Sequence, residues 1–103
     1  MQKIDPDLEK SIVEYENLER QLQMLVIQKN QLQLQLNEIS LATEELKKTV
    51  GEVYKSIGSV MVKSTKEDAD KDLKERKELI QIRLNTMNKQ EEKLRSSLLL
   101  MQK

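Results

Sequence analysis

Three aspartates in the run DADKD, at Asp68, Asp70 and Asp72, are spaced like the first calcium ligands of an EF-hand loop. Such a loop also requires glycine at its sixth position and glutamate at its twelfth. Leucines, Leu73 and Leu79, stand at those positions. We therefore interpret the aspartates as the acidic first turns of a helix, where carboxylates stabilise the positive end of the helix dipole. No metal site is predicted.

Other reactive residue types are missing from the sequence. It contains no histidine, no cysteine and no glycine-rich phosphate loop, which removes the commonest general bases, nucleophiles and soft metal ligands. We predict neither an enzyme nor a cofactor. The formal net charge is zero, which argues against nucleic acid or an acidic membrane surface as the main partner. Without a long apolar run or an apolar leader, we expect a cytoplasmic protein that spans no membrane.

The composition indicates a coiled coil rather than a globular core. Of the 103 residues, 37% are hydrophobic and 35% charged, with two tyrosines and no phenylalanine or tryptophan. A compact core of this size normally needs aromatic bulk, whereas a bias toward Leu, Glu, Lys and Gln is typical of long helices that pair. We predict one domain over residues 1–103.

Two long helical arms are predicted, over residues 5–50 and 66–103. In the first, Asp5 suits an N-cap, Pro6 the first helical position and Gly51 the stop. A heptad repeat continues through the ambiguous QLQLQL at 31–36, so helix is favoured there over strand. Twelve of its fifteen positions are apolar; the positions are Ile4, Leu8, Ser11, Tyr15, Leu18, Leu22, Leu25, Lys29, Leu32, Leu36, Ile39, Thr43, Leu46, Val50 and Val53.

The second arm begins with a capping box, formed either by Ser64 with Glu67 or by Thr65 with Asp68. Its repeat has seven apolar positions of nine; the nine are Leu73, Lys77, Ile80, Leu84, Met87, Glu91, Leu94, Leu98 and Met101. Two arms of similar length with a short link should fold back on each other. The predicted fold is mainly α: a long antiparallel two-helix coiled coil whose arms are joined by a single β-hairpin at 51–65.

The hairpin prediction rests on two strand-like runs around Gly58-Ser59, a suitable two-residue turn. An isolated two-stranded hairpin is marginal in water, and its edges present unpaired N–H and C=O groups to other chains. Its apolar residues have no core of their own in this chain. We therefore predict that the hairpin joins subunits into a sheet or barrel, rather than only capping the coiled coil; the residues assigned to this role are Val53, Tyr54, Ile57, Gly58, Val60, Met61 and Val62.

Two heptad arms around VYKSIGSVMVKST, followed by LKERKELIQIRLNTMNKQEEKL, resemble the beta class of prefoldin subunits, the archaeal type more than the eukaryotic. The specific part is the pattern Val-Tyr-Lys-x-x-Gly-x-Val-x-Val-Lys at residues 53–63; the heptads alone would fit many proteins. The resemblance implies a hexamer of two alpha and four beta subunits joined through their hairpins. It also implies an ATP-independent holdase that binds unfolded client proteins at the coiled-coil tips and delivers them to a group II chaperonin. A structural coiled-coil scaffold or tether that binds a folded partner is the alternative.

The chain ends are the predicted client-binding region. Consecutive residues of a helix point about 100° apart, so the run of leucines at 98–100 cannot all face one partner helix, and some apolar surface must stay exposed. A sealed or frayed tip is the competing interpretation. The residues predicted to bind clients are Ile4, Leu8, Ile12, Val13, Leu98, Leu99, Leu100 and Met101.

Lys29 and Glu91 interrupt the two apolar repeats. Polar residues at such positions either set the register of a coiled coil or extend to solvent. In both registers allowed by the hairpin the two lie one layer apart. We therefore predict that Lys29 and Glu91 contact each other across the seam.

Overall fold

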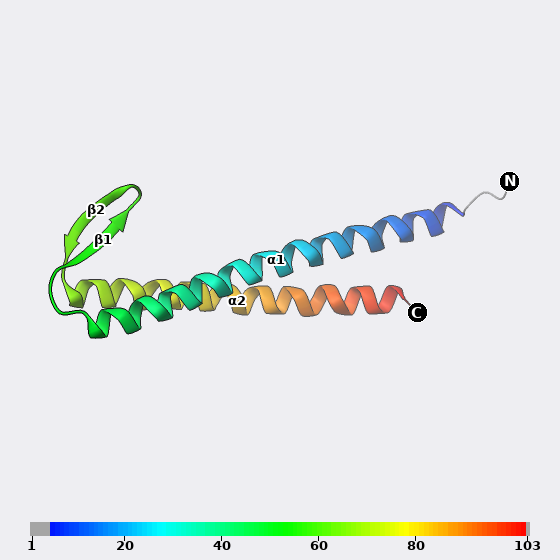
Figure 1. The fold of residues 1–103 in the computed structure, drawn as a ribbon. Helices are drawn as coiled ribbons and strands as arrows, with labels where there is room; N and C mark the ends of the chain where they lie inside the picture. The colour runs from blue at the N-terminus through cyan, green and yellow to red at the C-terminus, as the bar shows by residue number, and fades with distance from the viewer. Residues whose placement is uncertain (1–4, 103) are drawn as a thin grey trace. The chain divides into compact units, whose positions relative to one another are not determined.

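The computed structural model describes residues 5–102, and its element order confirms the predicted fold class (Figure 1). Helix α1 spans Pro6–Lys48 and helix α2 spans Lys66–Met101. Strands β1 (Val53–Ile57) and β2 (Val60–Ser64) lie between them. Neither helix of the described chain has a stretch both long and apolar enough to cross a membrane.

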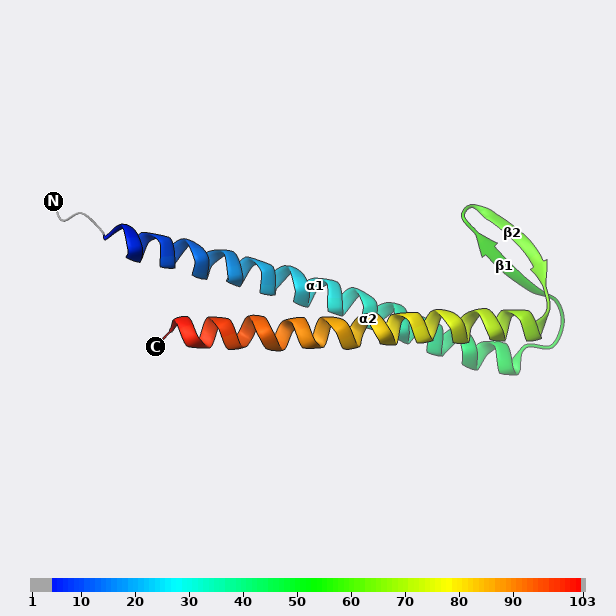
Figure 2. The same cartoon turned by 180° about the vertical axis from the view of Figure 1, so that it is seen from behind.

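The chain divides into two compact units, each containing part of both helices. One pairs α1 up to Gln31 with α2 from Leu84 onward, and the other spans Leu32–Arg83 and includes the hairpin. In each unit α1 and α2 lie side by side and run antiparallel, as both views show (Figure 2). The buried apolar residues all come from the predicted heptad positions and form the seam between the helices; they are Leu25, Leu32, Ile39, Leu46, Ile80 and Leu98.

The ends of α1 follow from local chemistry. Asp5 Oδ1 accepts a hydrogen bond of 3.0 Å from the Asp7 N–H, so Asp5 is the N-cap. The helix was expected to reach residue 50 but ends at Lys48. There Thr49 Oγ1 donates to the Glu45 carbonyl at 2.7 Å, and Gly51 adopts a φ of +123° that takes the chain toward β1.

Helix α2 begins with the second of the two capping alternatives. Thr65 Oγ1 accepts a hydrogen bond of 3.1 Å from the Asp68 N–H, so Thr65 rather than Ser64 is the N-cap. The first residue of α2 also serves the other helix. Lys66 Nζ donates to the carbonyls of Lys47 at 3.2 Å and Thr49 at 3.4 Å, which places a positive charge at the negative end of α1.

The hairpin has the predicted two-residue turn. Strands β1 and β2 are antiparallel, and Ile57 is paired with Val60 across Gly58-Ser59. Gly58 has a φ of +61°, whereas no residue other than glycine has positive φ in the described chain. Positive φ at the first turn residue alone is the geometry of a type II′ turn, which favours glycine there and matches the twist of the two strands.

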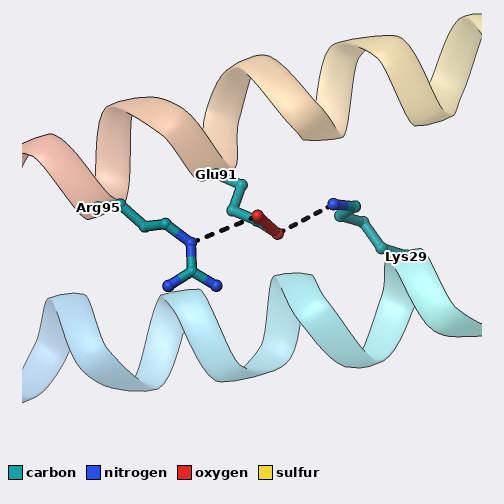
Figure 3. Close-up of polar contacts among 3 residues, drawn as sticks. All are labelled: Lys29, Glu91 and Arg95. Carbon is teal, nitrogen blue, oxygen red and sulfur yellow. Dashed lines mark hydrogen bonds and ion pairs between the residues drawn. The ribbon is translucent and has the colours of Figure 1, made fainter.

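Lys29 and Glu91 make the predicted contact across the seam (Figure 3). Lys29 Nζ donates to Glu91 Oε1 at 3.0 Å, and Arg95 Nε lies 3.4 Å from Glu91 Oε2 on the same helix. The side chains of Lys29 and Glu91 are 24% and 20% exposed, so neither extends fully to solvent. The hydrogen bond from Lys29 lowers the pKa of the Glu91 carboxyl; partial burial opposes this effect and Arg95 adds to it.

The lowered pKa of Glu91 predicts a pH-dependent contribution to stability. Because the folded state holds the carboxylate more strongly than the unfolded chain does, the contribution is complete above the unfolded pKa and is lost as the pH falls through the folded one. We expect Glu91→Gln to lower the Tm by a few degrees at about pH 7, and the two proteins to converge as the pH falls through the lowered pKa of the folded state. Thermal unfolding followed by circular dichroism measures this.

Glu92→Gln is the matched control, because Glu92 is the adjacent glutamate and lies exposed on α2. It should change the Tm much less than Glu91→Gln at neutral pH. Equal Tm values for Glu91→Gln and the parent chain at neutral pH would show that the ion pair contributes nothing to stability.

Candidate functional site

The outer part of the hairpin exposes apolar side chains on both faces. Side chains alternate along a strand, so Ile57, Val60 and Val62 share one face, and Tyr54 and Met61 share the other. All five are exposed. Each strand also has one edge that no other strand of the described chain covers, because the sheet has two strands only. Five of the seven residues predicted to join subunits therefore lie on an exposed apolar surface with unpaired backbone edges.

The root of the hairpin is anchored by charge. Val53 and Lys55 are half-buried on the face that turns toward the helices. Lys55 Nζ forms an ion pair with Asp72 Oδ2 on α2, and this oxygen is shielded from solvent. The hydrogen bond from Lys55 lowers the pKa of the Asp72 carboxyl; desolvation opposes this effect, and the nearby Arg76 and Lys71 reinforce it.

A second polar cluster lies on the opposite face, at the start of β1. The Tyr54 hydroxyl donates a short hydrogen bond to Glu52 Oε2, and Lys63 Nζ lies 3.4 Å from Glu52 Oε1. The hydrogen bond from Tyr54 lowers the pKa of Glu52 most, and the hydrogen bond from Lys63 lowers it further. The Glu52 carboxylate in turn raises the pKa of the Tyr54 hydroxyl. Tyr54 and Lys63 are cross-strand partners, so Glu52 links the two strands where they leave the helices.

A groove of about 410 Å³ separates part of the hairpin from the helices below it. Its floor includes Leu46 from α1 and Leu73 from α2, and its wall is β1 from Val53 to Ser56. The hairpin is therefore not closely packed on the helices along its whole length.

The other predicted surface lies in the unit that contains the chain ends. Leu8, Ile12, Val13, Leu99 and Leu100 are all exposed, and we call these five residues the tip surface. A groove of about 490 Å³ between the two helices is lined by Leu8, Ile12 and Met101, among others. The structure thus brings apolar residues from both helices together here.

Three residues predicted for client binding are placed differently from the tip surface. Leu98 is only 8% exposed, because its heptad position turns it into the seam. Met101 is half-buried on the same side of α2. Ile4 lies outside the described residues. Beside Met101, Gln102 Nε2 donates to the Tyr15 hydroxyl at 2.8 Å, which joins the last turn of α2 to α1.

The acidic run at the start of α2 is divided among separate contacts. Asp70 forms an ion pair of 2.9 Å with Lys74 one turn away, whereas Asp72 contacts Lys55 on the hairpin. Within residues 5–102 no three histidine, aspartate or glutamate side chains are grouped so that they could hold a metal ion.

Neither the pair of Lys55 with Asp72 nor the contacts of Lys66 with α1 was predicted from the sequence. Both join residues 17 to 19 positions apart on different elements, so no helical or strand periodicity reveals them. The only available signal was the spacing in the strand. Lys55 stands two residues from both Val53 and Ile57, and residues two apart in a strand lie on the same face.

Comparison with known proteins agrees with this architecture. The family model described as prefoldin subunit matches residues 9–103. Prefoldin subunit beta of Pyrococcus furiosus is 38% identical over 96 residues, which cover 91% of this chain and 82% of that protein. Its counterpart from Archaeoglobus fulgidus is 39% identical over 97 residues, covering 92% and 84%.

A solved structure is similar over nearly the whole chain. The crystal structure of the prefoldin beta subunit from Thermococcus strain KS-1 matches with a TM-score of 0.86 at 36% identity, covering 99% of this chain and 91% of that one. With two heptad helices, one hairpin and this degree of similarity to archaeal beta subunits, the chain belongs to the prefoldin subunit family, whose members are chaperone subunits that assemble with one another.

Proposed function

We propose that this chain is an ATP-independent holdase subunit of a cytoplasmic hexamer. In this proposal it joins prefoldin alpha subunits and further beta subunits, two alpha and four beta in all, through its hairpin. The complex binds unfolded client proteins at the tip surface and delivers them to a group II chaperonin.

The observation that carries the proposal is the exposure of the hairpin. Its apolar residues face solvent on both sides, and both of its edges are uncovered within the described chain. A two-stranded sheet of this kind is marginal alone, whereas pairing with other hairpins would bury the apolar faces and satisfy the edges. Assembly through the hairpin is therefore the arrangement in which this segment is most stable.

The tip surface supports client binding by its chemistry. Non-native proteins share exposed apolar segments, and a contiguous apolar patch on a soluble chain commonly marks a binding site. Leu8 and Ile12 of α1 line one groove with Met101 of α2, and Val13, Leu99 and Leu100 add exposed apolar side chains close to it in the sequence. Met101 adds a side chain that adapts to varied shapes.

Assembly is tested by placing charge on one face of the hairpin. We expect the double change Val60→Asp and Val62→Asp to abolish the complex with an alpha-class partner, because four or more like charges would be brought into one sheet. Helix content should change little. Sedimentation velocity and circular dichroism measure the two effects.

Val50→Asp is the control for this experiment, since Val50 is a 99% exposed valine outside the strands. It should assemble like the parent chain. A hexamer that survives the change at Val60 and Val62 would exclude the hairpin as the assembly element.

Client binding is tested at the tip surface with a closely matched pair of variants. Leu99 and Leu100 are 62% and 68% exposed, and so are Leu34 and Leu41 on α1. We expect Leu99→Ser with Leu100→Ser to weaken client binding by about thirtyfold, and with it the protection of a denatured client, since two apolar contacts worth about 1 kcal/mol each are lost. The change at Leu34 and Leu41 should leave protection intact.

The measurement is light scattering from an aggregating denatured protein in the presence of the assembled complex. Both variant complexes must first be shown to be hexamers. Equal protection by the two variants would argue against a tip site, and a parent complex without any protection would favour the scaffold or tether.

A further inference from the structure

The hairpin is linked to α2 by the ion pair of Lys55 with Asp72. The groove of about 410 Å³ lies on one side of this ion pair, and a second hollow of about 340 Å³ lies on the other, bordered by Val62, Lys63 and Glu75. Lys55 and Asp72 line both hollows. Their ion pair therefore crosses the space between hairpin and α2, with an open volume on each side.

The two helix ends next to the hairpin, the end of α1 and the start of α2, are bonded to each other. Lys66 Nζ bonds the carbonyls of Lys47 and Thr49, so the start of α2 is tied to the end of α1. The segments that connect the hairpin to these helix ends are short, and one of them contains Gly51 at a φ of +123°. Rotation of the hairpin about these connections would not break the helices, but it would break the contact of Lys55 with Asp72.

The chemistry of the pair suits a fixed support. Asp72 Oδ2 is shielded from solvent, and Lys55 is its ion-pair partner. If the hairpin turned away, the carboxylate would lose this partner while Arg76 and Lys71, which also stabilise its charge, stayed on α2. The pair thus favours one orientation of the hairpin over the others.

We infer that Lys55 and Asp72 form a strut that holds the hairpin in the orientation in which it joins other subunits. This inference rests on the proposed assembly through the hairpin. Lys55 and Asp72 act as positioning residues, because they prepare the surface that includes Val60 and Val62. A hairpin that is already oriented loses less conformational freedom on association.

The strut is tested first in the isolated chain, where assembly plays no part. The sequence contains no cysteine, so Ser59→Cys and Glu78→Cys provide one spin label on the hairpin turn and one on α2. We expect a narrow distance distribution between the labels in the parent background. Asp72→Asn and Lys55→Met should broaden it, and Asp72→Glu, which keeps the carboxylate, should keep it narrow.

Asp70→Asn is the matched control, because Asp70 pairs with Lys74 on its own helix and does not reach the hairpin. It should leave the distribution narrow. Equal widths in Asp72→Asn and the parent would overturn the strut. Circular dichroism establishes that every variant keeps its helices.

Assembly with an alpha-class subunit is then measured for the unlabelled variants. If the hairpin of Asp72→Asn is in the competent orientation for about a tenth of the time, its apparent affinity should fall about tenfold. Asp70→Asn and Asp72→Glu should assemble like the parent. A broadened distance distribution with undiminished assembly would refute the positioning role. Failure of the parent chain itself to assemble would instead refute the proposed function, and the label distances would still decide whether the strut exists.

Discussion

The apolar seam between α1 and α2 is the interaction on which the rest of the structure depends. Most of the stability of helices in proteins comes from packing one apolar face against another element. In this chain the packed face is a single row of leucines and isoleucines on each helix, including Leu32, Ile39 and Ile80. Each such side chain contributes about 1.5–3 kcal/mol when it is fully buried. No third layer covers the helices within the described residues, so most side chains outside the seam face solvent.

This constraint explains why the two half-buried charges of the seam, Lys29 and Glu91, are paired, whereas Lys77 at another heptad position is exposed. A lone charge buried in the seam would have to be desolvated without compensation. Lys29 and Glu91 instead meet at 3.0 Å and remain about one-fifth to one-quarter exposed, so that water still solvates both groups. Such a pair adds little to stability but disfavours shifted registers, because a shift would place each charge against leucine.

Because no third layer exists, the exposed apolar residues of the hairpin are not covered by another element of the described chain. The hairpin is built with a favourable turn and an ordered register, yet the apolar side chains of its outer half remain exposed in the described part of the chain. A sequence that retains valine, isoleucine and methionine on such a surface is suited to association rather than to life as a monomer. The ion pair of Lys55 and Asp72 fixes the orientation of that surface relative to the helices. Apolar packing alone would not fix it, because grooves lie between the hairpin and the helices at this point.

The sequence by itself determined the parts that depend on local periodicity. The heptads predicted the helices and the seam, and Gly58-Ser59 predicted the turn. The contact of Lys29 with Glu91 was predicted because these opposite charges interrupt the two apolar repeats one layer apart. Helix ends were predicted to within a few residues, and between two capping alternatives only the structure selected Thr65. These features were predictable because each depends on residues within a few turns of one another, or on one fold-back about a known turn.

Only the tertiary structure decided how the hairpin is held. The exposure of the three consecutive leucines follows instead from the repeat, since Leu98 occupies a heptad position and is buried, whereas Leu99 and Leu100 lie outside the repeat and are exposed. Lys55 and Asp72 follow no shared repeat, and their contact depends on the angle between a strand and a helix. That angle arises from the connections around Gly51 and Thr65 and from the link of Lys66 to α1. Such geometry depends on several elements at once, and for that reason no single stretch of the sequence encodes it.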